Sequence, residues 1–124
     1  MKPADIVAMG RDGTVRGGGK PSSEWPFHSA IYTARPEAGA VVHAHPPHAT
    51  SLACLGRSIP AFHYMVAVAG GDSIPCAAYA TPGSHALSNA VMAALEGRRA
   101  CLMANHGLVA YGENLSAALD LAVE

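Results

Sequence analysis

The sequence has little charge and lacks any long hydrophobic run. Charged side chains make up 14% of its 124 residues, and the formal net charge is -1. This balance argues against a surface for binding nucleic acid or membrane lipids. No apolar run reaches the roughly 18 residues of a membrane span, and the first residues do not read as a signal peptide. We therefore expect no nucleic-acid partner and no membrane association.

Cysteine is also scarce, with Cys54, Cys76 and Cys101 far apart and never in a CxxC pair. This pattern predicts reduced thiols in the core of a cytoplasmic protein. Half of the residues are hydrophobic, which is enough for one folded domain. The chain starts almost directly in a strand-like run, and its helix-like last ten residues have no C-terminal cap. We therefore expect a single domain over residues 1–124 that is incomplete at both ends.

Strand-like and helix-like patterns alternate along the chain. Their order predicts an α/β fold with a central mixed, largely antiparallel sheet covered by helices. A glycine-containing turn indicates a hairpin near the start. The expected segments are a hairpin over 5–16, strands over 38–45, 73–79, 100–104 and 108–111, and helices over 21–35, 48–55, 84–96 and 115–124.

The first expected helix begins in the sequence Pro-Ser-Ser-Glu-Trp-Pro. Ser22 or Ser23 is expected to cap it, and Glu24 suits the positive end of its dipole. Phe27 and Ile31 follow at helical spacing and should face the core. The same helix terminus, with its two serines, could bind a phosphate group.

Seven histidines are more than a chain of this size usually carries, and two of them form an HxH motif. His43 and His45 end an apolar run, and residues i and i+2 of a strand point to the same face. A single metal ion could therefore bind both imidazoles at roughly 2.0–2.1 Å. The alternative is two histidines on a polar strand face.

His106 favours the metal site over that alternative. It lies at a strand end beside Gly107, where a tight turn can direct a side chain into a cleft. Three imidazoles with an open fourth position are typical of catalytic zinc, and no cysteine has the spacing of a structural site. Glu24 is the natural fourth partner, although a carboxylate in a first helical turn is also favoured by the dipole alone.

The remaining histidines carry weaker signals. His48 completes an HxHxxH string like that of binuclear metallohydrolases, but Pro47 stands where those sites need an aspartate. His28 and His85 fall on expected helices and suit surface or supporting positions. Tyr64, next to two apolar residues, could be a core aromatic.

In combination these segments resemble the class II aldolase/adducin family, and within it the L-fuculose-1-phosphate aldolases. The resemblance covers nearly the whole chain, and its segments occur in the family's order. They are Pro21–His28, Val42–His45, His63–Met65, Ala69–Gly71, Ile74–Cys76, Tyr79–Gly83 and Asn105–Leu108.

The resemblance implies a three-layer fold and one Zn²⁺ ion per subunit, bound by His43, His45 and His106. It implies that Glu24 is the catalytic acid/base. The implied reaction is the retro-aldol cleavage of a ketose 1-phosphate to dihydroxyacetone phosphate and an aldehyde.

The resemblance further implies that Ser22 and Ser23 bind the substrate phosphate. Tyr64 would act on the aldehyde side, reaching the active site of a neighbouring subunit in a homotetramer. The alternatives are an L-ribulose-5-phosphate 4-epimerase, which would use the same zinc site, and a non-catalytic adducin-like or truncated remnant. The sequence departs from the family by lacking its upstream Gly-Asn-x-Ser and Thr-x-x-Gly segments, and by Pro82, where the closest relatives tend to have an aromatic residue.

Overall fold

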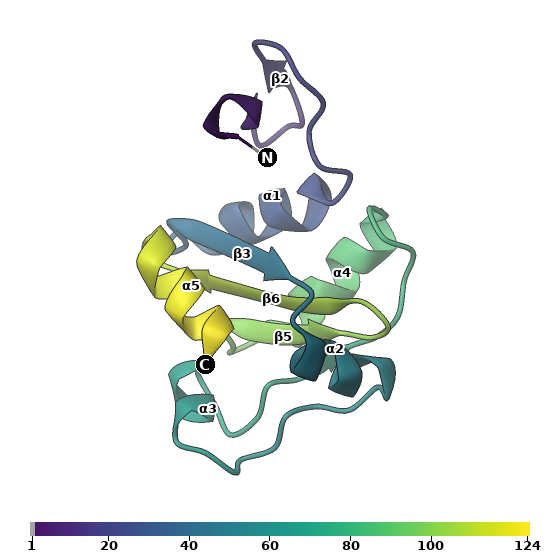
Figure 1. Cartoon of the computed structure of the whole chain (residues 1–124), viewed down its shortest axis with the longest axis vertical. Helices are drawn as coiled ribbons and strands as arrows, with labels where there is room; N and C mark the ends of the chain where they lie inside the picture. Colours follow the sequence, from purple (N-terminus) through teal and green to yellow (C-terminus); the bar gives the residue numbers. More distant parts are fainter. Residues whose placement is uncertain (1) are drawn as a thin grey trace.

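A computed structural model describes residues 2–124. Its elements confirm the expected alternation of strands and helices (Figure 1). They are, in chain order, the 3₁₀ helix η1 (Pro3–Asp5), β1 (Ala8–Met9), β2 (Val15–Arg16), α1 (Trp25–Ala34), β3 (Ala40–Ala44), α2 (Pro47–Cys54), α3 (Met65–Val68), β4 (Cys76–Ala77), α4 (His85–Ala94), β5 (Ala100–Met103), β6 (Gly107–Gly112) and α5 (Leu115–Val123).

The main sheet has the strand order β3-β6-β5-β4. β6 pairs antiparallel with both β3 and β5, whereas β4 pairs parallel with β5. The sheet is therefore mixed and largely antiparallel, as the sequence predicts. The register places His43 opposite Val109 and Ala44 opposite Leu108. The end of β3 consequently lies beside the turn that joins β5 to β6, which is the edge where the histidines meet.

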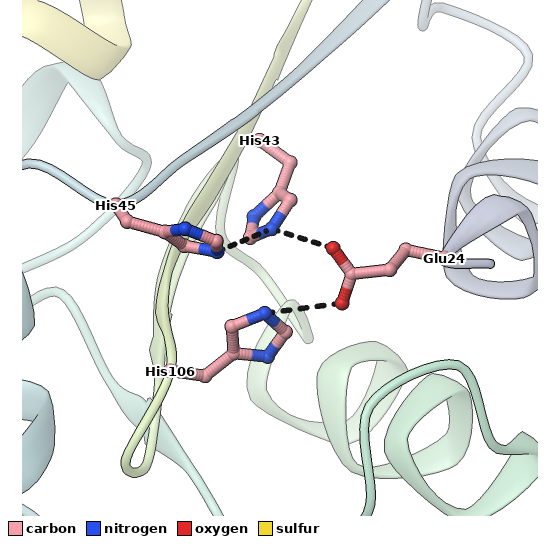
Figure 2. A group of neighbouring side chains, drawn as sticks. All are labelled: Glu24, His43, His45 and His106. Atoms are coloured by element: carbon pink, nitrogen blue, oxygen red, sulfur yellow. Dashed lines mark hydrogen bonds and ion pairs between the residues drawn. The ribbon is translucent and has the colours of Figure 1, made fainter. Parts of the chain in front are cut away.

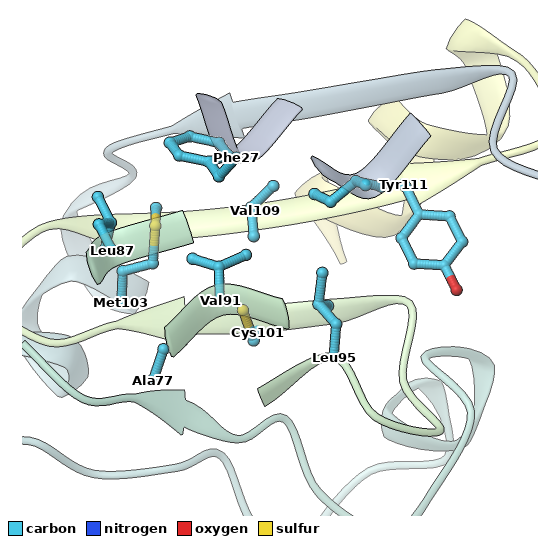
Figure 3. Packing of buried hydrophobic residues seen from close by; sticks show 10 residues of the cluster. Phe27, Ala77, Leu87, Val91, Leu95, Cys101, Met103, Val109 and Tyr111 are labelled. Atoms are coloured by element: carbon cyan, nitrogen blue, oxygen red, sulfur yellow. The ribbon is translucent and has the colours of Figure 1, made fainter. Parts of the chain in front are cut away.

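Helices cover both faces of this sheet and make three layers (Figure 1). On one face, α1 and α4 pack against Cys101, Met103 and Val109 (Figure 3). On the other face, residues of α2 and α5 pack against Leu102 and Ala110. Successive residues of β5 point to opposite faces of the sheet, and helices cover both faces. The side chains on both faces of β5 are therefore buried, and the strand is apolar throughout.

The N-terminal hairpin is attached to α1 rather than to the main sheet. β1 and β2 pair antiparallel, with strands shorter than the sequence predicts. Gly13 has a φ of +84° and lies against the indole of Trp25, where a Cβ atom would come within 2.8 Å of the ring. The Ser29 hydroxyl donates a hydrogen bond to the carbonyl oxygen of Arg11 at 2.5 Å. These two contacts hold the hairpin beside the start of α1.

The predicted cap of α1 is wrong. Glu24 occupies the N-cap position, and no side chain caps the helix. Ser22 Oγ instead accepts a hydrogen bond from the backbone N–H of Glu24 at 3.2 Å. Serine hydroxyls commonly form such local bonds two residues along the chain, and this bond takes Ser22 out of the capping role. Ser22 and Ser23 are both exposed.

The prediction that all three cysteines lie in the core is wrong for Cys54. All three are free thiols, with Cys101 buried, Cys76 partly buried and Cys54 exposed. Cys54 is exposed because α2 buries its neighbour Ala53, and consecutive helical residues point about 100° apart. Burial raises the pKa of the Cys101 thiol to about 12.

These environments predict selective alkylation. Iodoacetamide should modify Cys54 in the native protein and leave Cys101 unmodified until the protein is unfolded, because the thiolate is the reactive species. Peptide mass spectrometry after native and denaturing labelling measures this difference. If Cys101 of the native protein were labelled as fast as Cys54, Cys101 would not be buried within β5.

None of the helices within residues 2–124 has the length and apolar character needed to cross a membrane.

Candidate metal centre

Four side chains meet at the edge of the sheet where β3 ends. Glu24, His43, His45 and His106 each place one ligand-type atom within 4.8 Å of the others (Figure 2). His43 lies on β3, His45 directly after it, and His106 in the turn between β5 and β6. Glu24 reaches the group from the start of α1. The structure thus assembles the set of residues that the sequence singled out, while its role in binding metal stays a prediction.

One hydrogen bond orients the His43 ring. Nδ1 of His43 lies 2.7 Å from the carbonyl oxygen of Leu108, and because a carbonyl only accepts, Nδ1 must donate. In the neutral ring Nε2 then carries a lone pair. It faces Oε2 of Glu24 at 2.9 Å and Nε2 of His45 at 3.0 Å. The Glu24 contact therefore sets two lone pairs against each other, and a metal cation or an added proton between these atoms would relieve the repulsion.

The second carboxylate oxygen supports the cation. Oε1 of Glu24 lies 3.0 Å from Nε2 of His106, yet it is buried without a hydrogen-bond partner of adequate geometry among the described residues. Two ligands of one metal ion point their lone pairs at the ion rather than at each other. They can therefore lie about 3 Å apart without hydrogen-bond geometry, as these two atoms do. A buried carboxylate oxygen with no partner is costly, and a cation would satisfy it. The four residues therefore fit a divalent metal ion.

The electrostatics of His106 suit a ligand. Burial is the main cause that lowers its pKa, and the nearby His43 and His45 lower it further, while Glu24 acts in the opposite direction. A lower pKa favours the neutral imidazole, which is the form that binds a metal. Imidazole and carboxylate ligands suit several divalent transition-metal ions.

His28 supports the group from α1. Its ring stacks on Phe27 with centroids 4.7 Å apart, and the Phe27 ring meets His43 edge-on at 5.4 Å. Burial, and then the proximity of His43, lower the pKa of His28 to about 4. The sequence assigned His28 no definite role. The structure gives it a packing role beside the metal ligands, which depends on tertiary contacts that the sequence does not show.

Ser23 lies beside another segment that carries the family resemblance, Tyr79–Gly83. Gly83, with a φ of +77°, approaches Ser23 so closely that a Cβ atom would lie 2.7 Å from its carbonyl oxygen. The loop before α4 therefore packs against Ser23, close to Glu24 in the chain.

Tyr64 lies apart from these residues. It directly precedes α3, which Figure 1 shows below the main sheet, whereas α1 lies above it. Its side chain is 77% exposed, so the alternative of a core aromatic is wrong. His48 and His85 are also exposed and lie outside the four-residue group.

The sequence profile described as the class II aldolase and adducin N-terminal domain matches residues 1–124. The chain belongs to this family. The resemblance inferred from the motifs is confirmed, and the three-layer fold agrees with that of solved class II aldolases.

Two curated class II aldolases are similar over the whole chain. A 5-methylthioribulose-1-phosphate/5-deoxyribulose-1-phosphate aldolase from Rhodospirillum rubrum is 58% identical over 124 residues, which are 100% of this chain and 56% of that protein. An L-fuculose phosphate aldolase from Escherichia coli (strain K12) is 54% identical over 124 residues, 100% of this chain and 58% of its own. The chain thus spans a little over half the length of these relatives.

Among solved structures, an L-fuculose 1-phosphate aldolase aligns with a TM-score of 0.94 and 45% identity. The alignment covers 99% of this chain and 58% of the other.

Proposed function

We propose that this chain carries the metal centre of an aldolase that cleaves a ketose 1-phosphate between its third and fourth carbons. The products are dihydroxyacetone phosphate and an aldehyde. The observation that supports this most is the Glu24 carboxylate, which lies between His43 and His106 with each oxygen about 3 Å from an imidazole Nε2. This places a potential acid/base directly at the cluster that fits a divalent ion.

A Zn²⁺ ion bound by His43, His45 and His106 would supply a Lewis acid for the negative charge that develops on the substrate's carbonyl oxygen. The hydrogen bond from His43 Nδ1 to the carbonyl of Leu108 fixes the tautomer that such binding requires. The chain contains only two lysines, Lys2 and Lys20, both exposed. Charge stabilisation at the imidazole cluster makes a Schiff-base lysine unnecessary.

Glu24 is the proposed acid/base at the third carbon. When the bond between the third and fourth carbons breaks, its electron pair stays with the third carbon, and the proton of the 4-hydroxyl must leave. Glu24, in its carboxylic acid form, then delivers a proton to the third carbon, which completes dihydroxyacetone phosphate and leaves a carboxylate that regains a proton from solvent. In the reverse direction the carboxylate removes this proton, and its burial beside the imidazoles holds it in position.

Ser22 and Ser23 are the proposed phosphate ligands. Their hydroxyl groups are exposed, immediately before the N-cap of α1. The positive end of the helix dipole favours an anion at this place. The phosphate would thereby be held two residues from Glu24, and the first three carbons of the substrate would reach the metal centre.

Tyr64, acting in a neighbouring copy of a homotetramer, is the proposed group that handles the proton of the 4-hydroxyl: its phenolic oxygen takes up this proton while its own proton passes to water. Its exposure and its distance from the chain's own metal centre agree with such a role.

Tyr64→Phe should lower kcat roughly a hundredfold or more, the usual range for one acid/base group, and leave the metal content unchanged. Turnover and metal analysis measure the two effects. Tyr79→Phe, which changes another exposed tyrosine, is the matched control.

Mixing inactive variants tests the placement of Tyr64 between copies. Reassociated Tyr64→Phe and Glu24→Gln proteins should regain part of the wild-type rate, because some sites then combine an intact Glu24 with an intact Tyr64. A mixture as inactive as its components would show that both residues act within one chain.

A comparison of two substrates tests which aldehyde the enzyme releases. The substrates named for the two relatives share the carbons that become dihydroxyacetone phosphate and differ only beyond them. Release of dihydroxyacetone phosphate from L-fuculose 1-phosphate and from 5-methylthioribulose 1-phosphate should be measured on the zinc-loaded protein. We expect cleavage of the fuculose substrate. Preference for the other substrate would change the assignment of the aldehyde half. Epimerisation of L-ribulose 5-phosphate without cleavage of either substrate would contradict the proposal.

A further inference from the structure

The turn that bears His106 contains an uncommon backbone conformation. Asn105 has a φ of +56°, and no other non-glycine residue among residues 2–124 has a positive φ. The backbone N–H of His106 donates to the carbonyl oxygen of Met103 at 3.0 Å, which makes Asn105 the third residue of a four-residue turn. A positive φ at this position is what a type II turn requires, and glycine and asparagine tolerate it best.

The N–H of Asn105 connects the turn to α2. It donates to the carbonyl oxygen of Ala53 at 3.0 Å. α2 begins at Pro47, two residues after His45, and ends at Cys54. One end of this helix is thus joined through the chain to His45, and its other end is hydrogen-bonded to the residue before His106. An eight-residue helix is a stiff spacer of roughly 12 Å.

Gly107 fixes the other side of His106. A Cβ atom at Gly107 would overlap the carbonyl oxygen of Ala44 and would lie 2.6 Å from Cδ2 of His45. The turn therefore packs directly against the end of β3. His106 is held between Asn105, which is bonded to α2, and Gly107, which packs against His45.

We propose that Asn105 is a positioning residue for the metal centre. Its left-handed backbone, hydrogen-bonded to α2, sets the position of Nε2 of His106 relative to His45 and Glu24. The side chain of Asn105 is exposed and does not belong to the metal cluster, so this effect acts through the backbone. The inference rests on the proposed function in one respect, namely that the cluster binds a metal ion.

A matched pair of variants separates the backbone from the side chain. Asn105→Gly removes the side chain and permits a positive φ, whereas Asn105→Ala removes most of it and disfavours a positive φ. Co²⁺ affinity and the visible spectrum of bound Co²⁺ should be measured for both. Unfolding by urea in the presence of a chelator reports the stability of the metal-free protein.

We expect Asn105→Ala to weaken Co²⁺ binding roughly tenfold and to alter the spectrum, because binding must force the turn back to its left-handed conformation. Asn105→Gly should keep the wild-type spectrum and bind within roughly threefold of wild type, since glycine adopts this conformation without steric cost. The difference in affinity between the two variants is the readout that a general loss of stability would not produce.

Three results would overturn the inference while leaving the metal centre in place. They are wild-type binding by Asn105→Ala, equal weakening in both variants, and a change confined to the urea unfolding curve. Failure of the wild-type protein to bind Co²⁺ would instead remove the metal centre, and this inference with it.

Discussion

His43→Ala is expected to weaken zinc binding by more than about a hundredfold, the upper end of the cost of losing a supporting hydrogen bond around a metal site. The reason is that Nε2 of His43 contacts two other members of the cluster, lying 2.9 Å from Oε2 of Glu24 and 3.0 Å from Nε2 of His45. Titration against a chromophoric chelator measures the change. The substitution removes a proposed ligand and also its hydrogen bond to Leu108.

The matched control for this change is His85→Ala. His85 is exposed at the start of α4 and lies outside the four-residue group, so its removal should leave zinc affinity unchanged. Circular dichroism should show that both variants are folded, because the histidines of the cluster add little to the apolar core. Zinc binding by His43→Ala as tight as that of His85→Ala would mean that the cluster is not the binding site.

Glu24→Gln is expected to lower kcat by roughly 10²–10⁴, the range for the loss of one general acid/base. Glutamine has nearly the same shape and can still form hydrogen bonds with the imidazoles, but it cannot take up or deliver the proton at the third carbon. Zinc should remain bound through the three histidines. A coupled assay for dihydroxyacetone phosphate, with metal analysis of the same samples, measures both quantities.

Glu96→Gln is the control for the loss of a carboxylate. Glu96 is exposed just after α4 and belongs to no part of the metal cluster, so its change should leave both rate and zinc content intact. A zinc-loaded Glu24→Gln protein with more than a tenth of the wild-type rate would rule out Glu24 as the acid/base. Loss of zinc together with activity would instead assign Glu24 to metal binding.

The sequence was sufficient to predict the pair His43 and His45, because the two-residue period of a strand places alternate side chains on one face. It also predicted the largely antiparallel sheet from the order of its segments. The position of His106 beside His43 and His45 is harder to predict from the sequence, since it depends on β6 pairing with both β3 and β5. The resemblance to the family indicates His106 as the third candidate ligand more strongly than local patterns do.

Other features depend on contacts between distant residues and carry no local signal. The tautomer of His43 is set by the carbonyl of Leu108, 65 residues away. The bond between Asn105 and Ala53 joins segments with no shared periodicity. The start of α1 was misjudged because Ser22 bonds to the N–H of Glu24 instead of capping the helix. Such competition between two local hydrogen bonds is decided by geometry and not by residue type.

The central claim is that Glu24 and the three histidines form one catalytic metal centre. It is tested most directly by zinc stoichiometry measured together with release of dihydroxyacetone phosphate, on the metal-free protein and during stepwise addition of zinc. We expect one zinc ion bound per chain and cleavage that rises in proportion to zinc occupancy until it saturates at that ratio. Cleavage that is complete without metal, or stoichiometric zinc binding with no cleavage of any ketose 1-phosphate, would contradict it.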